Sequence, residues 1–364
     1  MLSFATLTSL ADTVHPERAA MIESLQATPG ILWKPAAHPR FAASPPGVAL
    51  APLMGVTGDW VKAINEAKAK GDIEEFVADP SVKIPAFFDA AEKWPECAKM
   101  INDIRDQSAC GCCWAFAGAE AASDRMCIAT NAKVMIPLSA QDLCFCGVQI
   151  FSHGCNGGQI NTPWDHIKRI GAVSGGQFNN TGPFGSDMCS DFSLPHCHHH
   201  GPKGADPYPD ENTPGCPNVA RSPKCPNSCD AGSPLTWKED KYTFKGKVQS
   251  ASGEAAIQQM IMAGGPVSTA FTVYSDFENY ASGIYHHVSG TMAGGHAVKF
   301  VGWGEDENGV KYWKVANSWN PFWGEEGHFR IVRGDSDGNG GIENSVVGAS
   351  ADAIWGKKSV LDAK

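Results

Sequence analysis

The distribution of cysteine constrains this chain more than any other sequence feature. All 13 cysteines lie from Cys97 onward, and most of them stand in segments rich in Gly, Pro and Asn. Segments of that composition are commonly held together by disulfides, which form in an oxidising compartment. We therefore expect a disulfide-stabilised globular unit after Cys97, and the odd count leaves at least one thiol free.

The first 83 residues have a different composition. They contain no cysteine, carry Pro-rich patches such as Ser44-Pro-Pro, and include one amphipathic stretch, residues 59–70, that predicts a helix. Two interpretations are open on these grounds, a small accessory domain and a removable prosegment.

The remaining chain divides into a helical part and a β part. Helix formers and small residues after Trp114 predict a buried helix that starts at Cys113, with Phe116, Ala119 and Met126 on its inner face. Residues 174–234 predict a long loop region without a core. Four β segments follow Lys245, and they are residues 267–273, 296–303, 311–319 and 328–332. The turn residues Glu307-Asn308-Gly309 predict that the middle two segments pair as a hairpin.

Charge and hydropathy exclude several classes of partner. The net charge is −10 and no stripe of Lys and Arg is present, which argues against nucleic acid. No run approaches the roughly 18 apolar residues of a membrane-spanning helix, so no membrane insertion is expected. Residues 1–10 lack the basic region and the long apolar region of a signal peptide, so none is evident.

The run Gln-Ser-Ala-Cys-Gly-Cys-Cys-Trp, residues 107–114, carries the first chemical signal. A free thiol has a pKa of about 8.5 and must be activated before it acts as a nucleophile. Cys113 stands at the predicted helix start, where the partial positive charge of the helix favours a thiolate. A nearby histidine would complete a thiolate–imidazolium pair.

His296 is the histidine that suits this role. It follows Gly294-Gly295 and opens a predicted strand, and the glycines would let a substrate backbone pass close by. Asn317 lies on the predicted partner strand, placed to orient the imidazole, and Trp319 beside it would exclude water. The three residue types form a Cys-His-Asn constellation.

Four motifs together resemble the papain-like cysteine peptidases over residues 85–348. They are Gln-x-x-Cys-Gly-x-Cys-Trp, Cys-Asn-Gly-Gly, Gly-Gly-His-Ala and Ala-Asn-Ser-Trp. The resemblance implies an α+β fold in which a helical domain and a β-barrel-like domain flank the active-site cleft, and it implies neither cofactor nor metal. It implies Cys113 as nucleophile, His296 as acid and base, Asn317 as orienter, and Gln107 with the Cys113 backbone N–H as oxyanion hole. The substrate-binding residues that it implies are Gly157, Gly158, Ala297 and Trp319.

An insertion separates this chain from most of that family. His296 follows Cys113 by 183 residues (296 − 113), whereas about 130 to 150 is usual. The inserted stretch, about residues 189–229, resembles the occluding loop of the cathepsin B subfamily, in which paired histidines receive the substrate's C-terminal carboxylate. His199 and His200 match that pair, and Asp106 resembles the acid that anchors the loop. The resemblance thus implies endopeptidase activity together with release of C-terminal dipeptides.

The resemblance also implies a set of disulfides. They are Cys97–Cys127, Cys110–Cys155, Cys146–Cys225, Cys189–Cys229 and Cys197–Cys216. Cys112 stands where the family has Ser or Ala, and a bridge from Cys112 to Cys144 is a hypothesis that restores parity. Two alternatives stay open, a share of the reactivity for Cys112 and a zinc site in the Cys/His cluster, although the cluster lacks paired C-x₂-C spacings.

The family pattern further implies the domain boundaries and the partners. Residues 84–89 resemble a mature N-terminus, which implies an inhibitory prosegment at 1–83 and a peptidase domain at 84–348. Its helical half would cover about residues 98–235 and its β half about residues 236–348, and a tail, residues 349–364, would follow.

Ser345 stands where relatives that accept Arg at P2 carry an acid, which predicts apolar P2 residues. Expected partners are peptide and protein substrates, the chain's own prosegment and cystatin-like inhibitors. The expected location is a lysosome, another acidic vacuole or the cell exterior. A non-catalytic peptide-binding relative and a peptide ligase are the alternative functions.

Overall fold

The computed structural model describes residues 14–147, 152–180, 182–185, 187–197 and 219–363. The α-helices are α1 Pro16–Gln26, α2 Pro39–Ala42, α3 Trp60–Ala69, α4 Ala90–Lys93, α5 Ala98–Ile101, α6 Cys113–Ala129, α7 Ala140–Cys146, α8 Thr162–Arg169, α9 Glu254–Gly264 and α10 Lys358–Asp362. Short 3₁₀ turns are η2 Ala51–Leu53, η3 Pro95–Cys97, η4 Gly154–Asn156, η5 Phe178–Asn180 and η6 Phe277–Asn279. No helix in these described ranges has the length and apolar character needed to cross a membrane.

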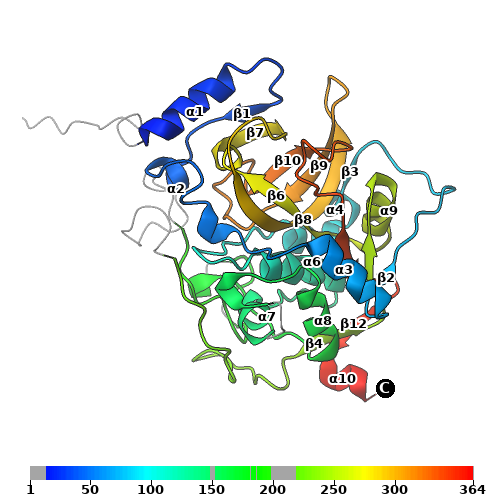
Figure 1. Cartoon of the computed structure of the whole chain (residues 1–364). Helices are drawn as coiled ribbons and strands as arrows, with labels where there is room; N and C mark the ends of the chain where they lie inside the picture. Colours follow the sequence, from blue (N-terminus) through cyan, green and yellow to red (C-terminus); the bar gives the residue numbers. More distant parts are fainter. Residues whose placement is uncertain (1–13, 148–151, 181, 186, 198–218, 364) are drawn as a thin grey trace, which may run out of the picture.

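Twelve strands form two sheets among the described residues. The strands are β1 Trp33–Pro35, β2 Glu74–Glu75, β3 Phe88–Asp89, β4 Tyr242–Lys245, β5 Val248–Ala251, β6 Val267–Tyr274, β7 Tyr280–Tyr285, β8 Met292–Glu305, β9 Lys311–Ala316, β10 His328–Val332, β11 Val346–Ala349 and β12 Ile354–Lys357. The ten-stranded sheet has the order β1-β7-β10-β9-β8-β6-β11-β5-β2, with β3 paired to β8, and the small sheet pairs β4 with β12. Figure 1 shows the large sheet above and the helices α6, α7 and α8 below it.

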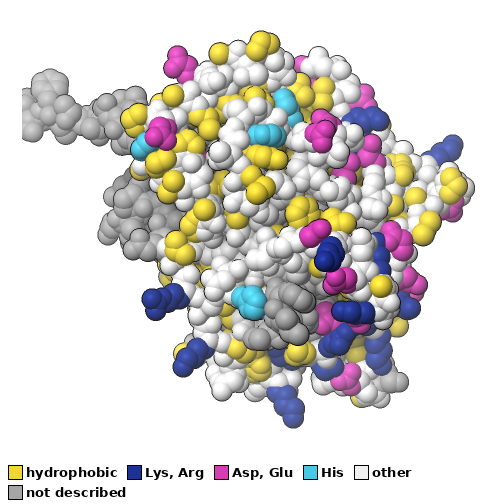
Figure 2. All heavy atoms as spheres, in the orientation of Figure 1, with side chains coloured by type: hydrophobic (Ala, Val, Ile, Leu, Met, Phe, Trp, Pro, Cys, Tyr) yellow, Lys and Arg dark blue, Asp and Glu magenta, His cyan; other side chains and the backbone are white. Residues whose placement is uncertain are grey.

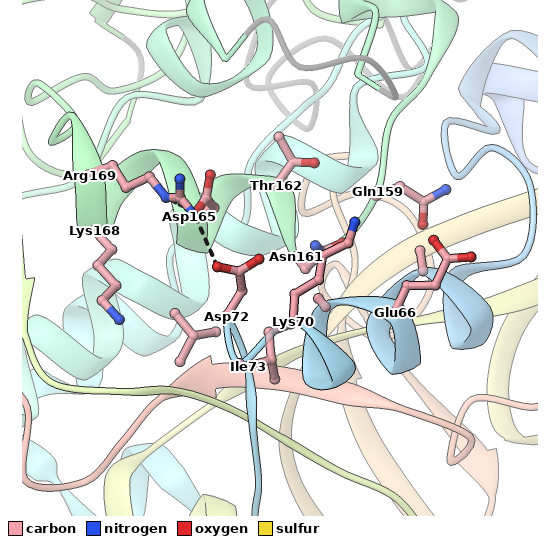
Figure 3. Close-up of a pocket in the computed structure, with 14 residues that line it drawn as sticks. Glu66, Lys70, Asp72, Ile73, Gln159, Asn161, Thr162, Asp165, Lys168 and Arg169 are labelled. Carbon is pink, nitrogen blue, oxygen red and sulfur yellow. Dashed lines mark hydrogen bonds and ion pairs between the residues drawn. The ribbon is translucent and has the colours of Figure 1, made fainter.

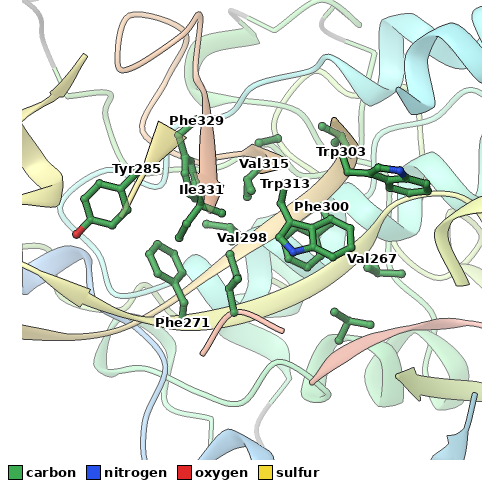
Figure 4. Close-up of a cluster of buried hydrophobic side chains, with 14 of the residues drawn as sticks. Val267, Phe271, Tyr285, Val298, Phe300, Trp303, Trp313, Val315, Phe329 and Ile331 are labelled. Carbon is green, nitrogen blue, oxygen red and sulfur yellow. The ribbon is translucent and has the colours of Figure 1, made fainter. Parts of the chain in front are cut away.

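The long strand β8 organises the β half. It pairs antiparallel with both β6 and β9, so the predicted hairpin is confirmed. Large apolar side chains such as Phe271, Phe300 and Trp313 fill the space that the strands enclose (Figure 4). The pairing with β6 continues to Met292, so β8 begins four residues before the predicted start and His296 lies inside the strand instead of opening it.

Helix α6 is the centre of the helical half. It begins at Cys113 as predicted, but every residue from Cys113 to Cys127 is buried, so it has no exposed face over that length. The guanidinium of Arg125 is satisfied by four backbone carbonyls, those of Met260, Gly265, Pro266 and Ala349, at 2.6 to 3.2 Å. Lys299 of β8 pairs with Asp124 at 2.8 Å. These buried polar contacts join α6 to the β half.

Five disulfides occur among the described residues, and all of them lie in the helical half. They are Cys97–Cys127, Cys110–Cys155, Cys112–Cys144, Cys146–Cys225 and Cys189–Cys229. Cys189, Cys225 and Cys229 therefore cannot act as thiolate ligands of zinc. Cys197 is also disulfide-bonded, and its expected partner Cys216 lies outside the described residues, as do His199 and His200.

Two segments contain packed structure that the sequence did not indicate. Residues 174–234 were predicted to hold no core residue, yet Phe192 is 2% exposed and its ring meets Phe116 edge-on at 4.7 Å. Residues 354–362, within the expected C-terminal tail, form β12 and α10, and β12 pairs with β4 while Trp355 packs on Phe244 at 4.7 Å. Local hydrophobic periodicity does not reveal either segment, because each packs against residues that are distant in the sequence.

Residues 14–83 lie along both halves and complete the large sheet. Strand β1 pairs with β7 at one edge, and β2 pairs with β5 at the other. Helix α3, with Asp59 as its N-cap, confirms the amphipathic helix and buries Ile64 and Ala67. Figure 1 shows this segment in blue, running from α1 past the sheet to α3 beside α8.

Candidate active site

The two halves meet at the sulfur of Cys113. Cys113 is the first residue of α6, and the carbonyl of Cys112 accepts the N–H groups of Ala115 and Phe116 at 2.9 and 3.1 Å. From the β half, the backbone N–H of Ala297 donates to Cys113 Sγ at 3.3 Å. The thiol is therefore placed between a helix N-terminus and strand β8, and Cys113 is the free cysteine among the described residues.

His296 is oriented by Asn317. The imidazole Nε2 lies 2.8 Å from Asn317 Oδ1. This contact assigns the hydrogen to Nε2, because an amide oxygen can only accept. In the neutral ring Nδ1 is then the nitrogen without a hydrogen. The ring packs against Trp319 at 5.0 Å and Phe271 at 6.0 Å. Asn317 follows the last residue of β9 instead of lying within the strand, and its own N–H is held by the Gly327 carbonyl at 3.0 Å.

Gln107 donates its amide into the same site. Its Nε2 lies 2.8 Å from the Cys110 carbonyl and 2.9 Å from the Leu53 carbonyl. The hydroxyl of Ser318 donates to Gln107 Oε1 at 2.8 Å, which decides which end of the amide faces the cleft. Sequence reasoning missed Ser318, although it stands inside the Ala-Asn-Ser-Trp motif.

Residues 53–57 fill the cleft. A Cβ on Gly55 would lie 2.2 Å from the Gly111 carbonyl oxygen and 2.9 Å from Cys113 Sγ, so only glycine passes there. Val56 N–H donates to the Gly295 carbonyl at 3.0 Å, and Gly158 N–H donates to the Gly55 carbonyl at 2.8 Å. Backbone hydrogen bonds therefore hold the segment to both walls of the cleft, at Gly158 on one side and Gly295 on the other.

Residues 53–57 keep water away from Cys113 and His296, which disfavours the charged form of each side chain. Burial raises the pKa of the Cys113 thiol to about 11, although N–H donors from Ala297 and Gly55 oppose the shift. Burial lowers the pKa of His296 to about 4, and the hydrogen bond to Asn317 only partly offsets it. Desolvation disfavours the charged form of each group. Thiol and imidazole are therefore both neutral at neutral pH while residues 53–57 are in place.

The structure places three more of the expected substrate-binding residues, Gly157, Ala297 and Ser345, as follows. Gly157 has φ +100°, and a Cβ there would lie 2.4 Å from Thr57 Cγ2. Val56 belongs to the hydrophobic cluster that also holds Ala297. Ser345 is buried directly before β11, and its carbonyl accepts the Thr269 hydroxyl at 3.2 Å.

Comparison with known proteins shows to which family this chain belongs. The model of the papain family of cysteine proteases matches residues 84–350. The chain belongs to the papain family. It is 42% identical over 270 residues to a cathepsin B-like cysteine proteinase of Schistosoma japonicum, covering 74% of each chain. It is 44% identical over 267 residues to cathepsin B-like cysteine proteinase 4 of Caenorhabditis elegans, covering 73% of this chain and 75% of that one.

Solved structures of proforms resemble this papain-family chain beyond its peptidase domain. Procathepsin B S9 from Trypanosoma congolense matches with a TM-score of 0.67 at 27% identity, covering 91% of this chain and 97% of that one. Procathepsin L 3 of Tenebrio molitor, at 19% identity and a TM-score of 0.61, shares the fold. The protein is a cathepsin B-like cysteine peptidase with a papain-like α+β fold. Its disulfides suit the secretory or lysosomal route.

Asp106 connects the helical half to the loop that follows Trp319. One carboxylate oxygen accepts the Cys197 N–H at 3.0 Å and the Asn320 amide at 3.0 Å. The other accepts the Ser108 N–H at 2.7 Å and lies 3.8 Å from the guanidinium of Arg40 in α2. The inserted loop is therefore tied to Asp106 through the Cys197 N–H, and Ser108 and Asn320 hold the Asp106 carboxylate in place.

Residues 14–83 use different contacts on the two halves. On the β half, Arg18 and Glu278 form a fully buried ion pair at 2.9 Å. On the helical half, Asp72 pairs with Arg169 at 3.1 Å, and both side chains are about half exposed. This second pair lines a groove of about 510 Å³ between α3 and α8 (Figure 3). On the face in Figure 2, acidic and basic side chains mingle over the lower part of the molecule.

Proposed function

We propose that this chain is the zymogen of a cysteine endopeptidase that also releases C-terminal dipeptides, and that residues 1–83 block the cleft until they are cleaved. One observation carries the proposal. The Leu53 carbonyl takes the Gln107 N–H, and Gly55 covers the Cys113 sulfur. A substrate carbonyl would need that same donor, so the two cannot bind together.

In the uncovered cleft, Cys113 is the nucleophile and His296 its acid and base. Water returns to both groups, so the desolvation that holds the thiol and the imidazole neutral is relieved and the proton can pass from sulfur to Nδ1. The thiolate attacks the scissile carbonyl carbon, and the negative charge on its oxygen is stabilised by Gln107 Nε2 and the Cys113 N–H. His296 then protonates the leaving amine, which gives an acyl-enzyme. Water attacks the thioester carbonyl as His296 removes its proton, and the carbon–sulfur bond breaks to release the carboxylic acid product and the Cys113 thiolate.

The nucleophile can be identified directly. We expect a thiol-directed epoxide to label Cys113 of the processed enzyme, because Cys112 is bridged to Cys144. Residue-level mass spectrometry reads the site of labelling, and a label on Cys112 would contradict the assignment.

Dipeptide release is assigned to His199 and His200 on the resemblance to the occluding loop. Two imidazolium groups would receive the free C-terminal carboxylate of a substrate. We expect processed enzyme to release dipeptides from a peptide with a free C-terminus and to lose most of that rate when the peptide is amidated. Replacing both histidines should remove the difference between the two peptides. Equal rates in the unmodified enzyme would reject dipeptide release while leaving endopeptidase activity intact.

An apolar P2 preference is assigned to Ser345 and the cluster around Ala297. Val56, an apolar residue, is 9% exposed in that part of the cleft, which supports an apolar subsite. We expect Phe-Arg reporter peptides to be cleaved faster than Arg-Arg reporters, because no acid at residue 345 neutralises a P2 guanidinium. Equal rates would remove this assignment.

Cystatin-like proteins are the expected external inhibitors of the uncovered cleft, and a lysosome, an acidic vacuole or the cell exterior is the expected site of action.

A further inference from the structure

Strand β7 lies next to the edge strand β1 and would itself be the edge of the large sheet without β1. Strand β1 pairs with it antiparallel, with Trp33 opposite Gly283 and Lys34 opposite Ser282. The Ile284 N–H donates to the Leu32 carbonyl at 2.9 Å. Figure 1 shows β1 and β7 side by side at the top of the molecule.

A socket for an indole lies on this edge. Trp33 is 3% exposed, and its ring lies 5.3 Å from that of Tyr285 and 6.2 Å from that of Tyr280. Its Nε1–H donates to the His286 carbonyl at 3.1 Å. Aromatic walls together with one acceptor for the indole N–H are selective for tryptophan, because Phe would leave the acceptor unmatched.

Gly283 allows the close approach of the added strand. It has φ +98°, and a Cβ there would lie 2.6 Å from the Leu32 oxygen and 2.7 Å from Trp33 Cα. Its own N–H is bound by Glu325 and its carbonyl by the Tyr280 hydroxyl. The edge is therefore held in shape by the peptidase domain alone, independently of β1.

We propose that in the processed enzyme the β7 edge, residues 280–286, is an exosite that binds an extended, tryptophan-containing segment of a protein substrate. This inference rests on the proposed removal of residues 1–83, which takes β1 away and leaves the socket in place. The main chain of such a segment would add to the sheet, and its tryptophan would enter the socket.

The position of the β7 edge favours a substrate over an unrelated partner. The ring of Phe277 lies 4.8 Å from Tyr285 and 5.6 Å from Trp319, so the socket shares a side-chain wall with the active-site residue Trp319. Residues 33–56 of this chain already reach both places, because β1 pairs with β7 while Gly55 and Val56 lie in the cleft, so one chain can occupy the cleft and the β7 edge together. Short reporter peptides cannot reach it.

A competition experiment tests the exosite. The probe is a synthetic peptide of residues 28–37, which contains Trp33 but none of the residues that fill the cleft. At saturation we expect it to slow cleavage of a reduced, carboxymethylated protein by at least about threefold, the effect of losing a moderate binding contact. It should leave the cleavage of a Phe-Arg reporter unchanged, and the Trp33→Ala peptide should have neither effect. No effect on the protein substrate, or equal inhibition of both substrates, would overturn the exosite.

Matched glycine variants give a second measurement. Gly283→Ala places a methyl group in the path of an added strand, whereas Gly309→Ala has similar backbone strain (φ +81°) at the β8–β9 turn, 3.4 Å from the nearest Glu305 atom. Fluorescence anisotropy of the labelled 28–37 peptide should show binding to processed enzyme and to Gly309→Ala, with at least about tenfold weaker binding to Gly283→Ala. Equal affinity for the two variants would reject the site. If the unmodified processed protein does not cleave the reporter, the result counts against the proposed function. Anisotropy measures binding at the exosite without any turnover, so the two failures can be told apart.

Discussion

The two halves of the peptidase domain are stabilised in different ways. The helical half carries every described disulfide and contains long irregular loops. The β half has no cysteine and is held by the large sheet and a core rich in aromatic side chains (Figure 4). The proposed chemistry needs both halves, because the proposed nucleophile Cys113 comes from the crosslinked half and His296 from the sheet.

The largest effect concerns the pair that spans the halves. Cys113→Ala and His296→Ala should each lower kcat of the processed enzyme by on the order of 10⁴ to 10⁶, because each removes one member of a unit that acts together. The double variant should be no slower than the slower single variant. Initial rates on a Phe-Arg reporter measure this, with circular dichroism as the control for folding. Additive losses would mean that the two residues act independently.

The second effect compares the two ion pairs that hold residues 14–83. Arg18→Met leaves Glu278 buried without its partner and should weaken docking by about 3 to 5 kcal/mol. Asp72→Asn breaks a half-exposed pair on the helical half and should weaken docking by less than about 1 kcal/mol. Both are read as the rate at which an epoxide labels Cys113 in the unprocessed chain. Equal labelling rates for the two variants would show that the buried Arg18–Glu278 pair contributes no more to docking than the exposed Asp72–Arg169 pair.

The third effect tests the covalent support of the helical half. The Cys112–Cys144 bridge closes a loop with a sequence separation of 32 residues at the start of α6. The double variant Cys112→Ser and Cys144→Ser should lower the free energy of unfolding by about 3 to 4 kcal/mol through the entropy of the unfolded chain. Guanidinium unfolding gives the value, and hydrogen exchange should rise in α7 before β8. An unchanged unfolding midpoint would argue against a stabilising bridge.

The smallest effect is a pH dependence of docking. His38, the N-cap of α2, accepts the Arg40 N–H on Nδ1 at 3.3 Å, and its Nε2 faces the Phe322 carbonyl at 3.0 Å. Burial, and then the Arg40 and Arg18 charges, lower its pKa to about 4. The released state binds the proton more readily, so docking is strongest above the ordinary value of about 6.5 and weakens as the pH falls toward 4.

Replacing the cap isolates this contribution. His38→Asn keeps a capping oxygen but does not titrate. The ratio of Cys113 labelling rates, unmodified chain over His38→Asn, should rise by roughly twentyfold between pH 7 and pH 5, because at pH 5 the released His38 is mostly protonated and the docked His38 is not. A ratio that is constant across this range would remove His38 as a source of acid sensitivity.

The sequence alone determined the elements whose signals are local. The start of α6 at Cys113, the amphipathic α3 and the β8–β9 hairpin all follow from periodicity, capping and turn residues. The four motifs of the papain family also identified which cysteine, histidine, asparagine and glutamine would share one site.

Only the tertiary structure decided which distant segments meet. Nothing local marks Gly55 as the residue that passes over Cys113, or β1 and β2 as the two edges of the sheet. The same holds for residues 354–362, whose strand β12 pairs with β4 and whose Trp355 joins the core cluster around α6. Such contacts depend on chain closure over tens to hundreds of residues, where backbone pairing and shape select the partner and no sequence period records it.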